Sequence, residues 1–323
     1  MKFLDNEVLR SNLSYNHKNH INCMKKILKS FFITQTCKIV MLLSLAIYFP
    51  PSQIKAGIID DVSKSVVFLS DNIPVEEVIN GISYDVILKN HTNNDMMIKQ
   101  NKISGSGLIV TSSNICYLVT AKHVALEMSD NCTVIMGGDK NTPLQFTLAS
   151  LVGQPNVHWF HDDTADISVF PLPTVTLQSA MALAGRAIPL GMLESGTNLP
   201  SRDDFVTALG FPLSLGAQGQ FYPLTRESKV SSGMLNDDKG YFFLLQDPSV
   251  SGYSGGSLFD AGEPKVEVNA NSVREITPGA HCWGFIFGNY SDEKGGKMCR
   301  VTPAFYAVQI IQKIEKTTRD LCQ

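Results

Sequence analysis

The chain has 323 residues, of which 44% are hydrophobic and 18% charged, and this composition excludes an intrinsically disordered protein. Its formal net charge is −3, but the first 56 residues hold 8 basic and 2 acidic side chains. Taking these from the 27 basic and 30 acidic residues leaves 19 and 28, a net charge of −9. Neither nucleic acid nor an anionic membrane surface is therefore an expected partner for the rest of the chain.

Residues 1–56 are predicted to be a secretory signal peptide. A lysine-rich stretch from Lys25 to Lys38 precedes an apolar run from Ile39 to Phe49, and Ala56 offers a small residue for cleavage. The run has 11 residues, whereas a membrane-spanning helix needs about 20. We expect secretion or periplasmic export after cleavage near Ala56, with Met24 as an alternative start. An uncleaved anchor or a buried helix is the competing interpretation.

Five cysteines follow residue 56, and an exported protein can form disulfides. Proximity in the sequence favours the pairs Cys116–Cys132 and Cys282–Cys299, which would leave Cys322 unpaired. Four cysteines nevertheless allow three connectivities. No CxxC or HExxH motif is present, so we predict neither a metal site nor a cofactor.

From residue 57 onward the sequence predicts mainly short β-strands. Apolar or alternating segments bounded by turn residues are expected to form strands at 66–69, 82–86, 107–110, 117–120, 133–136 and 167–170. A second series is expected at 205–209, 241–245 and 283–287. The turn at 112–114 predicts a hairpin between the strands expected at 107–110 and 117–120.

One helix is predicted, at the C-terminus. Thr302 and Pro303 have the properties of an N-cap and a first helical residue. The apolar residues that follow at helical spacing would lie on one face of that helix; they are Phe305, Val308, Ile311 and Ile314.

The segment Gly252-Tyr253-Ser254-Gly255-Gly256 carries the strongest chemical signal. A serine hydroxyl attacks a carbonyl only when a base removes its proton, and the oxyanion formed needs hydrogen-bond donors. Glycine at Gly252 would let its N–H point the same way as that of Ser254. A bare glycine-rich turn is the structural alternative.

Two further segments supply a base and an acid. His123 follows the apolar strand 117–120 and a small-residue turn, and histidine is the natural base near neutral pH. Asp166 directly precedes the strand 167–170, so it could orient the imidazole. Asp162 and Asp163 are alternative acids, and His158 and His161 are alternative bases nearby.

The sequence motifs TAKHV, ADISV and GYSGGSLFD, in the order His, Asp, Ser, resemble those of the trypsin-like serine proteases of the chymotrypsin fold. The resemblance implies an all-β fold of two six-stranded antiparallel barrels with a C-terminal helix. It implies a first barrel at 57–175, a connection at 176–200 and a second barrel at 201–323. His123, Asp166 and Ser254 would be the catalytic triad, and Gly252 and Ser254 the oxyanion donors. Protein or peptide substrates are implied, without a cofactor.

The departures from that family are informative. Zymogen-activated members have an aspartate directly before the nucleophile, where this chain has Tyr253, so bacterial or viral branches are the nearer comparison. The floor and wall of the substrate pocket would include Pro248, Ile286, Phe287 and Asn289, which favours cleavage after uncharged, medium-sized apolar residues.

Two other interpretations stay open. The GxSxG pattern around Ser254 also fits the nucleophile elbow of α/β-hydrolases, with His281 as the one later histidine. That fold needs a helix after the serine, and the residues that follow do not favour one. A catalytically silent binding protein on a protease fold is the second alternative.

Overall fold

The computed structural model describes residues 58–322, apart from the short segments 75, 80–81, 86, 90–95, 99, 154–157, 174–175, 261–264, 270–271 and 277–279. The chain divides into a unit of residues 56–313 and a second of residues 1–55 and 314–323. The predicted signal peptide lies outside the described residues. Among the helices that are described, none combines the length and the apolar character that a membrane crossing requires.

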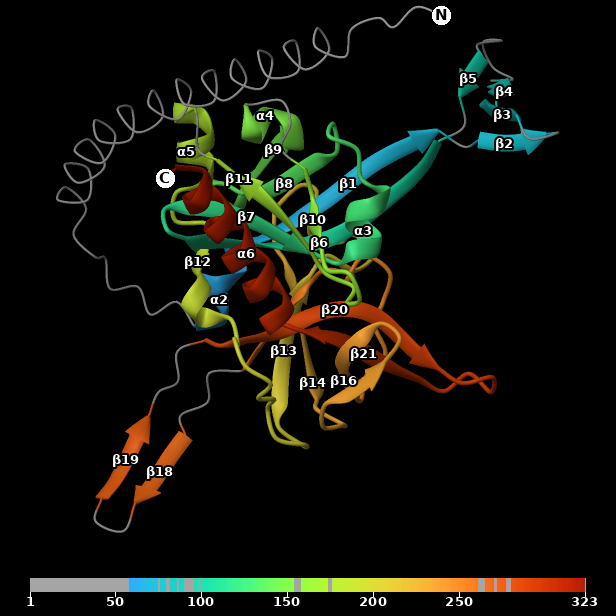
Figure 1. Cartoon of the computed structure of the whole chain (residues 1–323). Helices are drawn as coiled ribbons and strands as arrows, with labels where there is room; N and C mark the ends of the chain where they lie inside the picture. Colours follow the sequence, from blue (N-terminus) through green and yellow to red (C-terminus); the bar gives the residue numbers. More distant parts are fainter. Residues whose placement is uncertain are drawn as a thin grey trace, which may run out of the picture. The chain divides into compact units, whose positions relative to one another are not determined.

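The first sheet takes its eight strands from the N-terminal half of the 56–313 unit (Figure 1). The order is β10-β11-β7-β6-β1-β8-β9 with antiparallel pairing, and β12 adds to β6 in parallel. Its strands are β1 (Val66–Pro74), β6 (Gln100–Ser112), β7 (Ile115–Thr120), β8 (Thr133–Gly137), β9 (Pro143–Thr147), β10 (Phe160–His161), β11 (Ser168–Leu172) and β12 (Ile188–Pro189).

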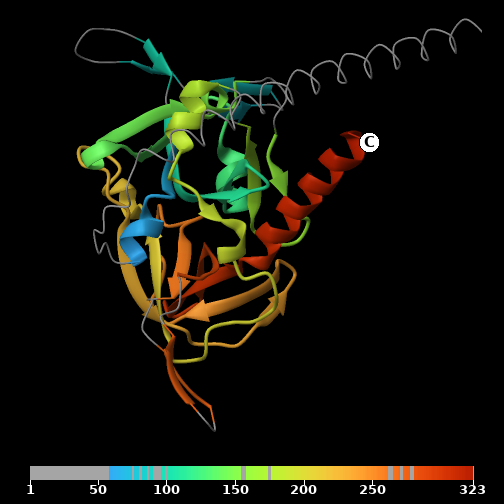
Figure 2. The same cartoon turned by 90° about the vertical axis from the view of Figure 1, so that its left-hand side faces the viewer.

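The second sheet takes its seven strands from the C-terminal half, and the two sheets occupy separate parts of the unit (Figures 1 and 2). The order is β14-β13-β17-β20-β21-β16-β15, antiparallel throughout. Its strands are β13 (Phe205–Gly210), β14 (Leu224–Lys229), β15 (Leu235–Asp237), β16 (Gly240–Leu245), β17 (Ser257–Asp260), β20 (Cys282–Ser291) and β21 (Lys297–Pro303).

The remaining elements are three two-stranded ribbons and short helices. The ribbons pair β2 (Glu76–Ile79) with β3 (Ile82–Asp85), β4 (Ile87–Lys89) with β5 (Met96–Ile98), and β18 (Lys265–Asn269) with β19 (Ser272–Ile276). The α-helices are α2 (Ile58–Ser63), α3 (Lys122–Glu127), α4 (Leu148–Val152), α5 (Leu177–Leu183) and α6 (Phe305–Cys322). The 3₁₀ turns are η1 (Asp139–Asn141), η2 (Leu190–Met192) and η3 (Pro212–Ser214).

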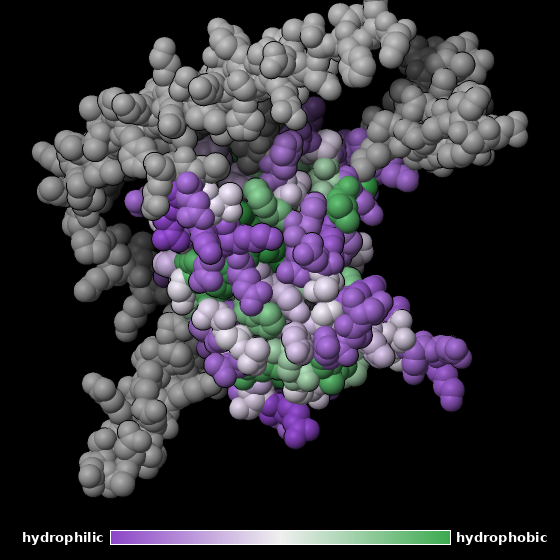
Figure 3. All heavy atoms as spheres, in the orientation of Figure 1, coloured by the Kyte–Doolittle hydropathy of each residue, from purple (hydrophilic) through white to green (hydrophobic). Residues whose placement is uncertain are grey.

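Each sheet has its own hydrophobic core. Apolar residues of the central strands are buried in two separate clusters, one for each sheet. Val67, Leu118 and Val134 belong to the cluster of the first sheet, and Phe243, Leu258 and Val301 to that of the second. On the face seen in Figure 3, hydrophilic side chains predominate over the described residues and hydrophobic ones form smaller areas between them. The burial of each sheet fixes the register of the strands that hold the site.

The β6–β7 hairpin and the C-terminal helix refine the sequence prediction. Ser113 and Asn114 adopt positive φ of 48° and 66°, as a two-residue hairpin turn of the primed type requires. Helix α6 begins at Phe305, not at Thr302, because Thr302 and Pro303 still pair with β20. Phe305, Val308 and Ile311 are buried, as expected for the apolar face of that helix.

The predicted fold class is therefore confirmed, since two antiparallel sheets carry the chain and a helix ends it. The sheets have eight and seven strands instead of six each.

The predicted disulfides are not formed, and Cys116, Cys132, Cys282 and Cys299 are all free thiols. Cys299 pairs with Asn289, seven positions along β20 from Cys282, so about 23 Å of strand separates the two. A disulfide needs Cα atoms within about 7 Å. β6 and β1 lie between Cys116 in β7 and the strand β8 that follows Cys132. Burial raises the pKa of the Cys282 and Cys299 thiols to about 12, which leaves them neutral.

Candidate active site

His123 and Asp166 form a close pair on the first sheet. His123 lies in the first turn of α3, directly after β7, and Asp166 lies two residues before β11, the strand that pairs with β7. One Asp166 oxygen accepts the backbone N–H of His123 at 2.8 Å, and the other lies 2.6 Å from the ring Nδ1. Asp166 is 9% exposed and the imidazole 42%, so the carboxylate is buried and the ring reaches solvent.

This geometry gives the imidazole one orientation. A buried carboxylate at Nδ1 keeps the proton there, which leaves Nε2 as the basic nitrogen. The carboxylate is itself fixed, because its second oxygen is held by the backbone of the same histidine.

The alternative acids and bases have other partners. Asp162 accepts hydrogen bonds from the backbone of Thr164 and Ala165, which shapes the loop before Asp166. The ring of His161 lies 2.6 Å from Ser168 Oγ, and burial lowers its pKa. Asp163 is exposed, and so is His158. Of these candidates, only Asp166 bonds to His123 in the described part of the chain.

Ser254 lies on the second sheet, in the loop between β16 and β17, and its backbone has an unusual hydrogen-bond pattern. The N–H groups of Tyr253, Gly255 and Gly256 donate to the carbonyls of Val250, Ile286 and Tyr253. In the part of the chain that the structure describes, the N–H groups of Gly252 and Ser254 have no such acceptor. These two donors are therefore free to bind an oxyanion.

The direction of those two N–H groups is fixed by the carbonyls before them. Ser251 O accepts from Leu213 N at 2.7 Å, and Tyr253 O accepts from Gly256 N at 2.7 Å. A trans peptide unit is planar, so each following N–H points the opposite way from its carbonyl. The N–H groups of Gly252 and Ser254 are held in place in the absence of any ligand, as electrostatic preorganisation requires.

Glycines let the two sheets meet at this point. Gly105 in β6 lies between the Val124 side chain and the Ser254 carbonyl, at 2.7 and 3.2 Å from where its Cβ would stand. Gly255 has φ of +80°, and a Cβ there would overlap Ser106 O and Thr120 Oγ1. The nucleophile loop thus packs against the strand end that leads to His123. Among the described contacts, no hydrogen bond yet joins Ser254 Oγ to the imidazole, a bond that is often long before substrate binds.

The four predicted pocket residues take different places. Pro248 and Ile286 line a cavity of about 10 Å³, as do Arg226, Asp247 and Tyr253. Phe287 instead lies beside His123, with ring centroids 5.9 Å apart. The Asn289 amide exchanges two hydrogen bonds with the backbone of Ser249, and so joins β20 to the nucleophile loop.

Sequence reasoning missed Ser106, Leu213 and Arg226. The one signal for Ser106 was its place between Gly105 and Gly107 inside an apolar strand, a pattern that indicates close backbone approach. Arg226 lies in β14, where nothing in the sequence indicates that it borders the cavity.

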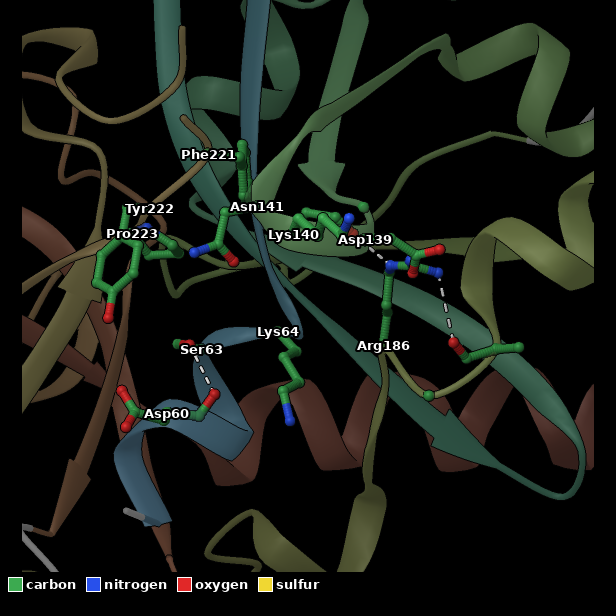
Figure 4. A pocket seen from close by; sticks show the side chains of 14 residues that line it. Asp60, Ser63, Lys64, Asp139, Lys140, Asn141, Arg186, Phe221, Tyr222 and Pro223 are labelled. Carbon is green, nitrogen blue, oxygen red and sulfur yellow. Dashed lines mark hydrogen bonds between the residues drawn. The ribbon is translucent and has the colours of Figure 1, made fainter. Parts of the chain in front are cut away.

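Another cavity, of about 410 Å³, holds none of the predicted site residues (Figure 4). Two of its charged groups have partners, since Lys64 pairs with Asp61 and Arg186 donates to the carbonyls of Gly137 and Ala182. It has no nucleophile paired with a base, so we assign it no catalytic role.

The structure has the arrangement that the resemblance of the sequence motifs implies. One antiparallel sheet carries the histidine and the aspartate, the other carries the serine, and a helix ends the chain. The chain has the chymotrypsin-like fold. Tyr253, which replaces the aspartate of zymogen-activated members, is buried, and its hydroxyl donates to Leu224 O at 3.2 Å. Burial raises the pKa of Tyr253 to about 12, so it stays neutral.

No protein-family model and no curated protein matches the chain. Among solved structures, it is similar to Rv3671c from M. tuberculosis H37Rv in an inactive serine-to-alanine form, with 14% identity over 83% of this chain and 95% of that one and a TM-score of 0.43. The HtrA-type protease AlgW with a decapeptide gives 16% identity over 80% and 67%, with a TM-score of 0.46. The MamO protease domain from Magnetospirillum magneticum gives 14% over 77% and 96%, with a TM-score of 0.42. These scores are below 0.5, so the proposals below depend on the chain's own geometry.

Substitution of Gly252 tests the oxyanion loop. Gly252 has φ of +90°, and a Cβ there would overlap the Phe211 carbonyl oxygen, so Gly252→Ala must displace the adjoining N–H. We expect peptide hydrolysis to fall by about 10²–10³-fold in kcat, as for loss of one oxyanion donor. Gly233→Ala is the matched control, because its Cβ meets no atom within 4 Å. Equal turnover by Gly252→Ala and wild type would contradict the assignment.

Proposed function

We propose that the chain is a serine endopeptidase in which Ser254 is the nucleophile, His123 the general base and Asp166 the residue that orients it. One observation supports this above the others. Within the described residues, the N–H groups of Gly252 and Ser254 have no protein acceptor. Those of Val250 and Ser251 have none either, but these two residues are exposed to solvent, whereas Gly252 is buried and Ser254 half-buried. A loop with a purely structural role gains nothing from two fixed and unpaired donors, since unmade hydrogen bonds cost stability.

The chemistry follows from this arrangement. His123 Nε2 removes the hydroxyl proton as Ser254 Oγ attacks the peptide carbonyl carbon, and the carbonyl oxygen becomes an oxyanion facing Gly252 N–H and Ser254 N–H. The Asp166 carboxylate stabilises the imidazolium. His123 then gives the proton to the leaving amine, which breaks the C–N bond and leaves an acyl-enzyme. Water, deprotonated by His123, attacks the ester and restores Ser254.

The two competing interpretations fare differently. The α/β-hydrolase alternative is wrong, because strand β17 follows Ser254 where that fold requires a helix, and His281 instead lies 3.0 Å from Glu194. The silent binding protein keeps the same fold. The free donors and the His123–Asp166 pair favour catalysis, since a binding surface needs neither.

Peptides or proteins are the proposed substrates, and export is the proposed route to them. The N–H groups of Gly252 and Ser254, next to the Ser254 hydroxyl, support a substrate with a reactive carbonyl such as a peptide bond. The basic and apolar N-terminal segment supports export with cleavage near Ala56. N-terminal sequencing of the exported protein tests this, and a chain that retains Met1 or Met24 would contradict it.

Ser254→Ala tests the catalytic role. The substitution removes one hydroxyl that has no hydrogen bond among the described residues, so the folded state should be unaffected. We expect casein hydrolysis to fall by at least ~10⁴-fold. Wild type should react with a fluorophosphonate at Ser254, and folded wild-type protein that fails to react would favour the binding protein.

The cavity beside the nucleophile loop supports a preference for small, uncharged side chains before the cleaved bond. Its volume of about 10 Å³ is near that of a single water site. Arg226 and Asp247 both line it, and neither forms an ion pair with another described residue. Arg226 donates to Pro248 O, which places its charge beside another residue that lines the cavity. With opposite charges on the same cavity, neither a basic nor an acidic side chain gains net pairing.

Two single substitutions test this balance of charge. Arg226→Met should leave Asp247 unopposed and favour cleavage after Lys or Arg, whereas Asp247→Asn should leave Arg226 and favour Asp or Glu. We expect shifts of at least about tenfold in relative kcat/KM, the factor that roughly 1.4 kcal/mol produces. The residue preference of wild type and of both variants can be measured by mapping their cleavage sites in a denatured proteome. A wild type that prefers charged residues, or variants that shift in neither direction, would refute the proposal.

A further inference from the structure

We infer that Ser106, a residue of the first sheet, positions the oxyanion loop of the second. The expected effect on catalysis rests on the proposed function, whereas the role of Ser106 in ordering the loop does not depend on it. Ser106 lies within β6, paired with Phe68 of β1, and is fully buried at 0% exposure. It touches neither substrate nor reacting atoms, so it is a positioning residue and not a catalytic one.

Every polar group of Ser106 is used, and three of its four hydrogen bonds cross the boundary between the sheets. Its backbone N–H donates to Ser254 O at 2.8 Å, and its carbonyl accepts from Thr120 Oγ1 at 2.7 Å. Thr120 ends β7, three residues before His123. Through its backbone alone, Ser106 therefore joins the nucleophile to the strand that leads to the base.

The hydroxyl of Ser106 makes two further hydrogen bonds, both to backbone groups of the second sheet and its loops. It donates to Gly252 O at 2.7 Å and accepts from Phe211 N at 2.9 Å. The direction of both bonds is certain, because a carbonyl can only accept and a backbone N–H can only donate. One buried hydroxyl thus holds together the residue that supplies an oxyanion donor and the start of the loop at η3.

That loop needs such an anchor. Leu213 and Ser214 adopt left-handed φ of 52° and 61°, a conformation that is strained for a residue other than glycine and persists only where its surroundings enforce it. Leu213 N–H is also the donor that fixes Ser251 O, and hence the direction of Gly252 N–H. Without the Ser106 hydroxyl, the loop can relax its strain, and the Ser251–Gly252 peptide loses the contact that orients it.

Ser106→Ala isolates this contribution, because alanine keeps both backbone bonds and removes only the hydroxyl. We expect kcat to fall by about 10²-fold while KM changes by less than about threefold. Affinity for an alanine-ending peptide boronic acid, whose tetrahedral adduct uses the oxyanion donors, should fall by the same factor as kcat. Binding of the corresponding peptide amide, whose neutral carbonyl gains much less from those donors than an anion does, to the inactive Ser254→Ala background should change by less than about threefold on Ser106→Ala.

Ser179→Ala is the matched control. Ser179 is also buried, and its hydroxyl likewise donates to one backbone group and accepts from another, but both belong to Thr176 at the start of α5. Loss of stability alone should affect both variants similarly, whereas only Ser106→Ala should lose boronate affinity. If Ser106→Ala does not fold, Ser106→Cys has a similar volume and only a weak donor, and serves the same purpose.

Amide hydrogen exchange at Leu213 gives a readout that needs no activity. We expect exchange at least about tenfold faster in Ser106→Ala than in wild type or Ser179→Ala. Unchanged exchange at Leu213, or an active Ser106→Ala with wild-type kcat and boronate affinity, would overturn the inference. A wild type that neither cleaves peptides nor binds the boronate would instead refute the proposed function, and the exchange rates would still decide the role of Ser106.

Discussion

The site depends on one constraint, the fixing of four consecutive carbonyls from Ser251 to Ser254. Leu213 N, Ser106 Oγ, Gly256 N and Ser106 N hold them in that order. Because peptide units are planar, these bonds also set the directions of the N–H groups between them. A flexible glycine-rich segment is thereby given a single conformation, and most of the entropy cost of ordering it is met when the chain folds and not when substrate binds.

Two of the four donors belong to the first sheet, so the oxyanion loop is ordered only when both sheets are in place. The same junction brings the histidine-bearing strand against the nucleophile loop, where Gly255 leaves room for Thr120. Neither half of the described unit contains a complete site. This arrangement ties catalytic competence to the packing of the whole unit, since a shift between the sheets would separate base from nucleophile and turn the oxyanion donors together.

The small cavity shares this dependence. It is lined by Asp247 and Pro248, which precede Ser254 in the same loop, and by Ile286, whose backbone bonds to Gly255 and Gly256. Asn289 fixes Ser249 from the neighbouring strand. Substrate selection and transition-state stabilisation thus use one connected segment, so a substitution in the cavity wall can alter both.

The sequence motifs around His123, Asp166 and Ser254 predicted the fold class. Apolar runs and the alternation of apolar and polar residues located most of the strands that hold the site. The cysteine pairs were wrong because proximity along the chain ignores register: Cys299 pairs with Asn289, far along β20 from Cys282. Of the predicted pocket residues on β20, Ile286 lines the small cavity, Phe287 lies beside His123 and Asn289 bonds to Ser249. The register of β20 shifts between Ile286 and Gly288, and no local pattern indicates this.

The sequence by itself determined which local conformations were available, because glycines, apolar periods and turn residues act over a few positions and need no distant partner. It could select Asp166 over Asp162 only as a preference. Tertiary structure decided which carboxylate meets the imidazole, that Arg226 opposes Asp247, and that Ser106 holds Gly252. The residues of each pair lie at least 21 positions apart in the sequence, and what brings such residues together is the packing of strands and sheets, whose register no local pattern encodes.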